Sequence, residues 1–149
     1  MVFELFATLC AALFAGAALY VNLVEHPARK ATGPAAALRQ WRPSYHRATV
    51  MQASLAVLGM LAGLAAWLRG AGRWWLVGAV LLGAVVPFTL IVVFPTNRRL
   101  EDLDPDADPA LVVSLLDRWA ASRRPQPAVA RGAHLLRGCL ASTALSRGA

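Results

Sequence analysis

Cysteine is scarce in this chain of 149 residues, and the sites that depend on it are missing. Cys10 and Cys139 form no C-x-x-C pair and stand in apolar surroundings, which argues against a redox or zinc site. No glycine-rich phosphate loop and no internal repeat are present. His26, His46 and Glu25 match no ligand spacing of a known metal site, so we expect no metal. A haem held by His26 and His134 is disfavoured too, because both would need matching depth on facing helices.

Charge is absent from three long stretches, Leu5–Val24, Ala48–Leu68 and Trp74–Phe94. Each is close to the roughly 20 residues that a helix needs to cross the hydrocarbon core. In lipid every backbone amide needs an internal partner, so runs of this length form helices rather than strands. With 58% hydrophobic residues, the sequence predicts an all-α transmembrane helical bundle.

Basic residues are missing from the N-terminus, where Met1–Glu4 has none. The first stretch therefore does not resemble a secretory signal, and we expect it to be retained. The positive-inside rule places the N-terminus outside and the two basic connections in the cytoplasm. We expect an integral protein of a bacterial plasma membrane, in contact with lipids, whose net charge of +7 reflects topology rather than nucleic-acid binding. The basic residues of the two connections are Arg29, Lys30, Arg39, Arg42 and Arg47, then Arg98, Arg99, Arg118, Arg123 and Arg124.

The whole chain, 1–149, is expected to form one membrane domain with three clear spans and a marginal fourth C-terminal helix. The clear spans are predicted at about 3–27, 45–69 and 72–95. Leucines and Trp119 at helical spacing predict an interfacial helix at about 109–121. A marginal helix is predicted at about 128–146, where the longest uncharged run has only nine residues. Whether this segment spans the membrane, and whether copies of the chain associate, stays open.

Small and polar residues on the second stretch recur at steps of three or four, so they share one face of a helix. Helices in lipid pack closely through such faces and use amide or hydroxyl groups across the contact. We expect this face, and a similar line on the first stretch that includes Asn22, to look into the bundle. Polar contacts between helices explain Asn22 and Gln52 as well as a binding role does. The face on the second stretch comprises Tyr45, Thr49, Gln52, Ala56, Gly59 and Gly63.

Polar clusters stand where the stretches begin or end, and three successive crossings would bring them to one side of the membrane. Glu25 and His26 close the first stretch, Tyr45 and Arg47 precede the second, and Asn97 follows the third. A carboxylate at a helix C-terminus needs a cationic partner, for which Arg29 and Arg47 are both candidates. The cluster is either an ion-paired helix end or a site in which His26 or Glu25 accepts a proton. Pro27 is expected to end the first helix, Pro95 the third, and Pro87 to kink the third.

Trp41 and Tyr45 are one turn apart if the second helix begins early, and would form an aromatic wall beside Arg47. A flat aromatic ligand binds well against such a wall, although anchoring at the membrane interface explains the same residues. Asn97 could cap the third helix or point back toward this wall.

Together these motifs resemble the anthrone-oxygenase-like family of small membrane proteins, over about Gly16 to Trp119. The resemblance rests on the order and spacing of several short motifs, and it implies a four-helix membrane bundle. Trp119 and the His134-Leu135-Leu136-Arg137 run fit the start of the family's fourth helix, but an Arg- and Pro-containing segment separates them. The motifs are Glu25-His26-Pro27-Ala28-Arg29, Trp41, Tyr45, Arg47, Gln52, Pro87-Phe88-Thr89-Leu90 and Pro95-Thr96-Asn97-Arg98-Arg99-Leu100.

The resemblance implies oxidation of an anthrone to an anthraquinone by O₂, which fungal relatives are associated with and which is thought to need no cofactor. Such a reaction needs a base, an aromatic cleft and a group that stabilises an oxyanion. From residue type and position we predict His26 as the base, Glu25 orienting it, and Arg47 or Asn97 holding the oxyanion. The predicted substrate-binding residues are Trp41, Tyr45, Gln52, Asn22, Asn97 and His134.

A non-catalytic membrane protein is the alternative, either an accessory subunit or a bundle that binds a lipid or another hydrophobic ligand. A closed aromatic cavity reached by His26 would favour the oxygenase, whereas solid packing at the motif-bearing end would favour the alternative.

Overall fold

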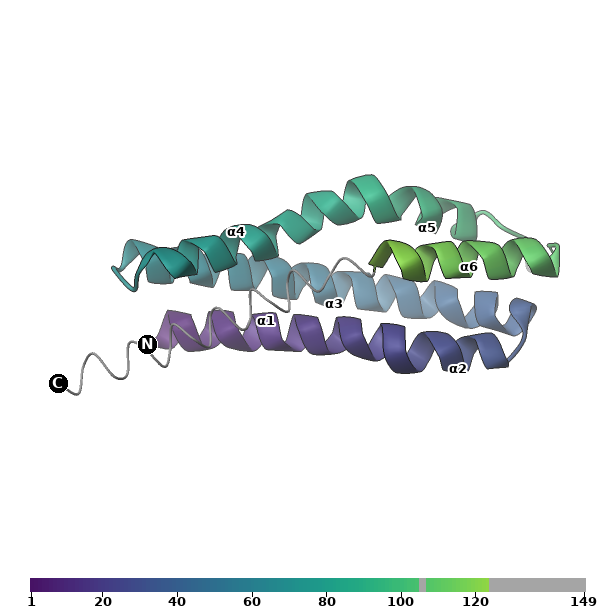
Figure 1. The fold of residues 1–149 in the computed structure, drawn as a ribbon, viewed down its shortest axis with the longest axis horizontal. Helices are drawn as coiled ribbons and strands as arrows, with labels where there is room; N and C mark the ends of the chain where they lie inside the picture. The colour runs from purple at the N-terminus through teal and green to yellow at the C-terminus, as the bar shows by residue number, and fades with distance from the viewer. Residues whose placement is uncertain (105–106, 124–149) are drawn as a thin grey trace.

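The computed structural model describes residues 1–104 and 107–123, and in this part of the chain the fold is an all-helical bundle (Figure 1). Within the described residues, three helices are long and apolar enough to cross a membrane: Val2–Ala31, Pro34–Leu68 and Arg73–Glu101. Successive helices run in opposite directions (Figure 1). Tight turns join them, and Gly33 and Gly72 supply the positive φ angles of 89° and 105° that these turns need. The predicted fold class is therefore confirmed.

Shorter elements make up the long helices. The first consists of α1 (Val2–Tyr20), a π-helical turn η1 (Val21–Glu25) and α2 (His26–Ala31). The second is the single helix α3 (Pro34–Leu68). The third consists of α4 (Arg73–Phe88), a π-helical turn η2 (Thr89–Val93) and α5 (Phe94–Glu101). A fourth and shorter helix, α6 (Pro109–Arg123), folds back along α5 (Figure 1). The predicted helix at 128–146 lies outside the described residues.

Two prolines that were expected to end helices lie inside them, so this part of the prediction is wrong. The first long helix continues through Pro27 to Ala31, and the third continues through Pro95 to Glu101. Each proline stands two residues after a π-helical turn, in which the amide of His26 bonds to the carbonyl of Val21 and that of Phe94 to Thr89. The wider turn relieves the clash between the proline ring and the carbonyl four residues earlier. The helices therefore pass the prolines without stopping.

The second helix begins earlier than expected, at Pro34 rather than near residue 45. Proline is favoured in the first turn of a helix, where its missing amide costs nothing. The predicted connection between the first two spans is consequently almost all helix, broken only by the turn at Thr32 and Gly33. Trp41 and Tyr45 thus lie one turn apart on one helix, as the aromatic wall requires.

The half of the bundle that contains the N-terminus packs through small residues. A Cβ atom on Gly59 would overlap Leu82 and lie 3.0 Å from the Cβ of Cys10. One on Gly63 would lie 3.2 Å from the Cβ of Ala79. These approaches bring α3 against α1 and α4. The prediction for the small-residue face is confirmed for its buried members, and we call this region the tight half. Its core consists of Ala7, Ala11, Phe14, Ala56, Ala62, Ala66, Trp75, Leu82 and Val85.

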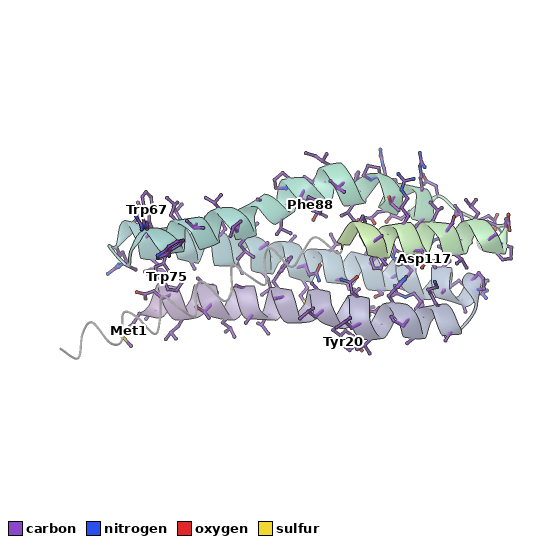
Figure 2. The ribbon with its side chains drawn as sticks, viewed as in Figure 1. Met1, Tyr20, Trp67, Trp75, Phe88 and Asp117 are labelled. Atoms are coloured by element: carbon purple, nitrogen blue, oxygen red, sulfur yellow. The ribbon has the colours of Figure 1, made fainter. Side chains whose placement is uncertain are left out.

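The other half, which we call the aromatic half, encloses α6 as well as the three long helices. The third long helix turns away from α3 near Phe88 (Figure 2), and α6 occupies the space between α3 and α5 (Figure 1). The sequence predicted that this helix lies at the membrane interface, but its apolar face is buried in the bundle. A second core forms here, of Val21, Ala37, Leu38, Trp41, Val93, Leu100, Val112, Leu115, Leu116, Trp119 and Ala120.

Candidate functional site

A cavity of about 120 Å³ lies where the two halves meet, bounded by α1, α3, α4, η2 and α5. That volume is roughly ten times what a single buried water requires. Most of the wall is apolar, and none of the described residues that line it is charged. The cavity therefore suits an uncharged and largely apolar guest. Its lining residues are Phe14, Tyr45, Thr49, Gln52, Ala53, Ala56, Val85, Val86, Thr89, Leu90, Val93 and Asn97.

Tyr45 and Asn97 form the polar end of this cavity. The side-chain amide of Asn97 donates a hydrogen bond of 2.9 Å to the Tyr45 hydroxyl oxygen. Asn97 is fully buried, and its Oδ1 atom has no hydrogen-bond partner among the described residues. An orphaned buried acceptor costs free energy unless something donates to it. The pair thus offers a guest one acceptor, Asn97 Oδ1, beside one donor, the Tyr45 hydroxyl.

Three further polar side chains lie along the wall. Gln52 is buried and projects from α3 one to two turns beyond Tyr45. Thr49 lies between them on the same helix, and Thr89 faces them from η2. The Thr89 hydroxyl donates to the carbonyl of Val85 at 2.8 Å, and the backbone amide of Thr89 bonds to the same carbonyl. The face predicted from small and polar residues therefore turns toward a cavity as well as toward neighbouring helices.

Aromatic rings connect this cavity to α6. Trp41 stacks on Tyr45 with ring centroids 4.8 Å apart and planes inclined by 3°. Trp119 also contacts Trp41, in a T-shaped arrangement with ring centroids 5.8 Å apart, and His26 packs against Trp119 at 6.0 Å. Trp41 is fully buried and Trp119 nearly so. The stack fixes the Tyr45 ring, which positions its hydroxyl at the cavity.

A buried ion pair ties α2 to α3 behind the aromatic rings. The Arg29 guanidinium, only 2% exposed, pairs with Glu25 one turn earlier. The Ser44 hydroxyl joins them, donating to Glu25 at 2.5 Å and accepting from Arg29 at 3.2 Å. Glu25 is thus paired with Arg29 rather than Arg47, and the pair lies inside the first long helix instead of at the helix end that the sequence predicted. Replacing only one of the two residues would therefore lower the stability of the fold, because the remaining charge would lose its partner.

A second polar contact ties α6 to α2. Asp117 accepts hydrogen bonds of 2.7 and 2.9 Å from the Lys30 ammonium. His26, 8% exposed, has its Nε2 atom 3.6 Å from the same carboxylate. The bonds from Lys30 hold the pKa of Asp117 below its usual value. His26 is therefore oriented toward α6, and it is not part of the cavity wall.

The chain matches the family model described as anthrone oxygenase over residues 41–124, more than half of its length. The protein belongs to this family. No curated protein and no solved structure matches the chain. The predicted family is thereby confirmed, although the name of a family does not assign a substrate to this member.

The part that matches the anthrone oxygenase family contains most of the cavity. Tyr45, Gln52, Thr89 and Asn97 all lie within residues 41–124, as do Trp41 and the whole of α6. Glu25, His26 and Arg29 lie outside it. The matched region thus supplies the polar end of the cavity, and the first long helix supplies the packing behind it.

The structure brings together Tyr45, Gln52 and Asn97, three of the residues predicted to bind a substrate. Trp41 stands directly behind Tyr45. Asn22 instead donates to the carbonyl of Ala18 in its own helix at 2.9 Å. Arg47 is exposed and does not line the cavity. His134 lies outside the described residues, and the predicted roles of all these residues remain predictions.

Two residues that form polar contacts around the site were not predicted from the sequence. Ser44, which completes the ion pair, carries no signal beyond lying beside Tyr45. Asp117 is 87 residues from Lys30 along the chain. An acidic residue on an amphipathic helix predicts only that it lies on the solvent-exposed face. Only the docking of α6 could have revealed that contact. Among the described residues, no cluster of three or more potential metal ligands is found.

Proposed function

We propose that this protein is a membrane oxygenase that uses O₂ to oxidise an anthrone-like phenolic polycyclic ketone to the corresponding quinone. The observation that carries the proposal is the Tyr45–Asn97 pair at one end of a largely apolar cavity whose described lining residues carry no charge. Membership of the anthrone oxygenase family supports the reaction class. A flat apolar ketone fits such a wall, and its oxygen atom needs one well-placed donor.

The reaction balances without a further reactant. An anthrone and O₂ give an anthraquinone and water. Loss of the C10 proton leaves an anthrolate, which passes one electron to O₂. The carbon radical and superoxide then combine into a C10 peroxide. Cleavage of the O–O bond with loss of water leaves the new carbonyl group. The difficult step is the first, because it places negative charge on the ketone oxygen.

Tyr45 would stabilise that charge. Its hydroxyl oxygen already accepts a hydrogen bond from Asn97, which polarises the O–H group and makes it a better donor. The bond from Tyr45 strengthens as the ketone oxygen becomes an oxyanion, so it favours the transition state over the ground state. The orphaned Oδ1 atom of Asn97 would accept from a phenolic hydroxyl on the same edge of the substrate.

The first step also needs a group that accepts the C10 proton. Within the part of the chain that the structure describes, the residues that line the cavity include no carboxylate and no imidazole. His26 contacts Trp119 and Asp117, and Trp119 in turn contacts Trp41, which stacks on Tyr45. His26 as the base stays a prediction, and this geometry favours a role in holding α6. A His26→Ala variant separates the roles, because a base contributes about 10²- to 10⁴-fold to the rate whereas a docking residue contributes to stability.

Oxygen uptake with an anthrone, measured on protein in lipid nanodiscs and corrected for protein-free nanodiscs, tests the proposal. Tyr45→Phe should lower kcat by about 10²-fold, the usual effect of removing one oxyanion donor. Tyr20, the other tyrosine of the chain, is exposed on α1 and provides the matched control as Tyr20→Phe. Equal rates for both variants, or no uptake by wild type above background, would contradict the proposal.

Ligand binding without catalysis is the second candidate, favoured because the described residues of the cavity wall include no carboxylate, imidazole or other charged group. In that case the protein would bind an uncharged aromatic compound saturably, and Tyr45→Phe would weaken binding. No oxygen would be consumed. The same nanodisc samples distinguish the two functions.

A further inference from the structure

The cavity reaches the outer surface of the bundle between α3 and η2. Three of its lining residues are exposed: Thr49 and Ala53 on α3, and Leu90 on η2, which is 58% exposed. The residues at the other end, including Gln52 and Asn97, are buried. The space therefore runs inward from an opening in the side of the bundle to the Tyr45–Asn97 pair.

The opening lies at the level of the charge-free stretches. Thr49 and Ala53 fall within Ala48–Leu68, and Leu90 falls within Trp74–Phe94. The adjoining surface is apolar and exposed, with Val50 and Met51 on α3 and Ile91 and Val92 on η2. In a bilayer such a surface contacts acyl chains. The opening thus faces lipid rather than either aqueous phase.

The π-helical turn η2 shapes this opening. Thr89, Leu90 and Val93 all line the cavity, and the third long helix turns away from α3 in this region (Figure 2). Single π-helical turns occur frequently at functional sites, where they displace side chains from the regular helical pattern. Here the turn contributes Leu90 to the cavity wall, together with Thr49 and Ala53 of α3.

We propose that the cavity is loaded sideways from the lipid phase, through the opening bounded by Thr49, Ala53 and Leu90, by an uncharged polycyclic aromatic compound with one hydrogen-bonding edge. The opening is apolar and the described lining residues carry no charge, which disfavours a charged guest because its desolvation would not be offset by a partner. The bilayer concentrates apolar aromatics, so entry from lipid supplies the cavity at a higher local concentration than water does. The hydrogen-bonding edge meets Tyr45 and Asn97 at the inner end.

This entry route rests on the proposed function because both use the same cavity. The experiment that tests it measures the binding of a ligand and not its oxidation. The probe is 2-hydroxyanthracene, followed by the anisotropy of its emission, with wild-type protein in nanodiscs under nitrogen. Its sulfonated analogue, anthracene-2-sulfonate, stays in water and is the control compound. Oxygen is excluded, so the experiment measures binding alone. The entry route can therefore be tested even if the protein binds the ligand without oxidising it.

Leu90→Trp narrows the opening, and Ile91→Trp is its matched control, since Ile91 is 73% exposed on the same turn and does not line the cavity. We expect Leu90→Trp to slow association of 2-hydroxyanthracene at least tenfold and Ile91→Trp to change it less than twofold. Doubling the lipid at fixed probe should lower occupancy, because lipid dilutes the probe in the membrane. Anthracene-2-sulfonate should not bind.

Equal association rates in the two variants, occupancy independent of lipid, or equal binding of the sulfonate would overturn the proposal, as would the absence of saturable binding. Ala53→Leu tests the other side of the opening if Leu90→Trp loses its helical circular dichroism. It should also slow association.

Discussion

The tight half and the aromatic half of this bundle hold their helices together by different means. In the tight half, Gly59 and Gly63 allow close backbone approach, and the buried side chains are apolar. In the aromatic half, Trp41 and Trp119 fill the core, and Arg29, His26 and Asn97 are buried beside them. Buried polar groups rarely add net stability, and an orphaned one subtracts from it. From this comparison we predict that the tight half contributes most of the stability of the bundle and that the aromatic half contributes the buried polar groups of the proposed function.

Replacing Asn97 by leucine should separate the two properties most clearly. Leucine has a similar size and removes both the bond to Tyr45 and the orphaned Oδ1 atom. We expect kcat for anthrone oxidation to fall by about 10²-fold, while the unfolding temperature stays the same or rises. Oxygen uptake and thermal unfolding of the same sample measure both. A large loss of stability with unchanged activity would reverse the assignment of the two halves.

Gly59→Val should show the opposite pattern. A side chain there would overlap Leu82 and crowd Cys10, so we expect the free energy of unfolding to fall by about 1–3 kcal/mol. Gly16→Val is the matched control, because nothing lies within 4 Å of a Cβ atom at Gly16. Unfolding in detergent, followed by circular dichroism, compares the two. If both substitutions have the same effect, close packing at Gly59 does not hold the tight half together.

Acid should loosen the docking of α6, with the smallest effect of the three. The lowered pKa of Asp117 means that its contact with Lys30 stabilises the fold at pH values above the usual aspartate pKa. This contribution is lost as the pH falls through the lowered pKa, below about pH 4. The pair is partly exposed, so the effect should not exceed about 1 kcal/mol. Amide hydrogen exchange in α6 should rise with acid in wild type and depend less on pH in Asp117→Asn. If hydrogen exchange in wild type and in Asp117→Asn has the same pH dependence, the Lys30–Asp117 pair does not stabilise the docking of α6.

The sequence predicts the three long helices well because runs without charge have a single stable solution in lipid. It also predicts the inward face from Gln52 to Gly63, since side chains three or four residues apart share one side of a helix. Arg47 was a candidate for the same site as Tyr45 because the segment was read as the start of a helix after a loop. Inside α3 the two residues are about 200° apart around the axis, so they cannot face the same cavity.

The passage of the chain through Pro27 and Pro95 could not be predicted from local rules, which treat a proline as the end of a helix. Both depend on a π-helical turn, whose stability comes from packing along the whole helix. The Lys30–Asp117 contact and the nearness of Tyr45 and Asn97 also depend on how distant segments dock. Such contacts appear only in three dimensions.

The π-helical turn η2 determines the direction in which the side chains of α5, including Asn97, point around the helix axis. A π turn holds one residue more than the α-helical path it replaces, and one residue corresponds to about 100° of rotation. Deleting a single residue between Thr89 and Val93 would leave the composition of the helix almost unchanged. It would nevertheless rotate Asn97 away from Tyr45 and take the hydrogen-bonding end from the cavity. One inserted residue in η2 therefore decides whether Asn97 lies beside Tyr45.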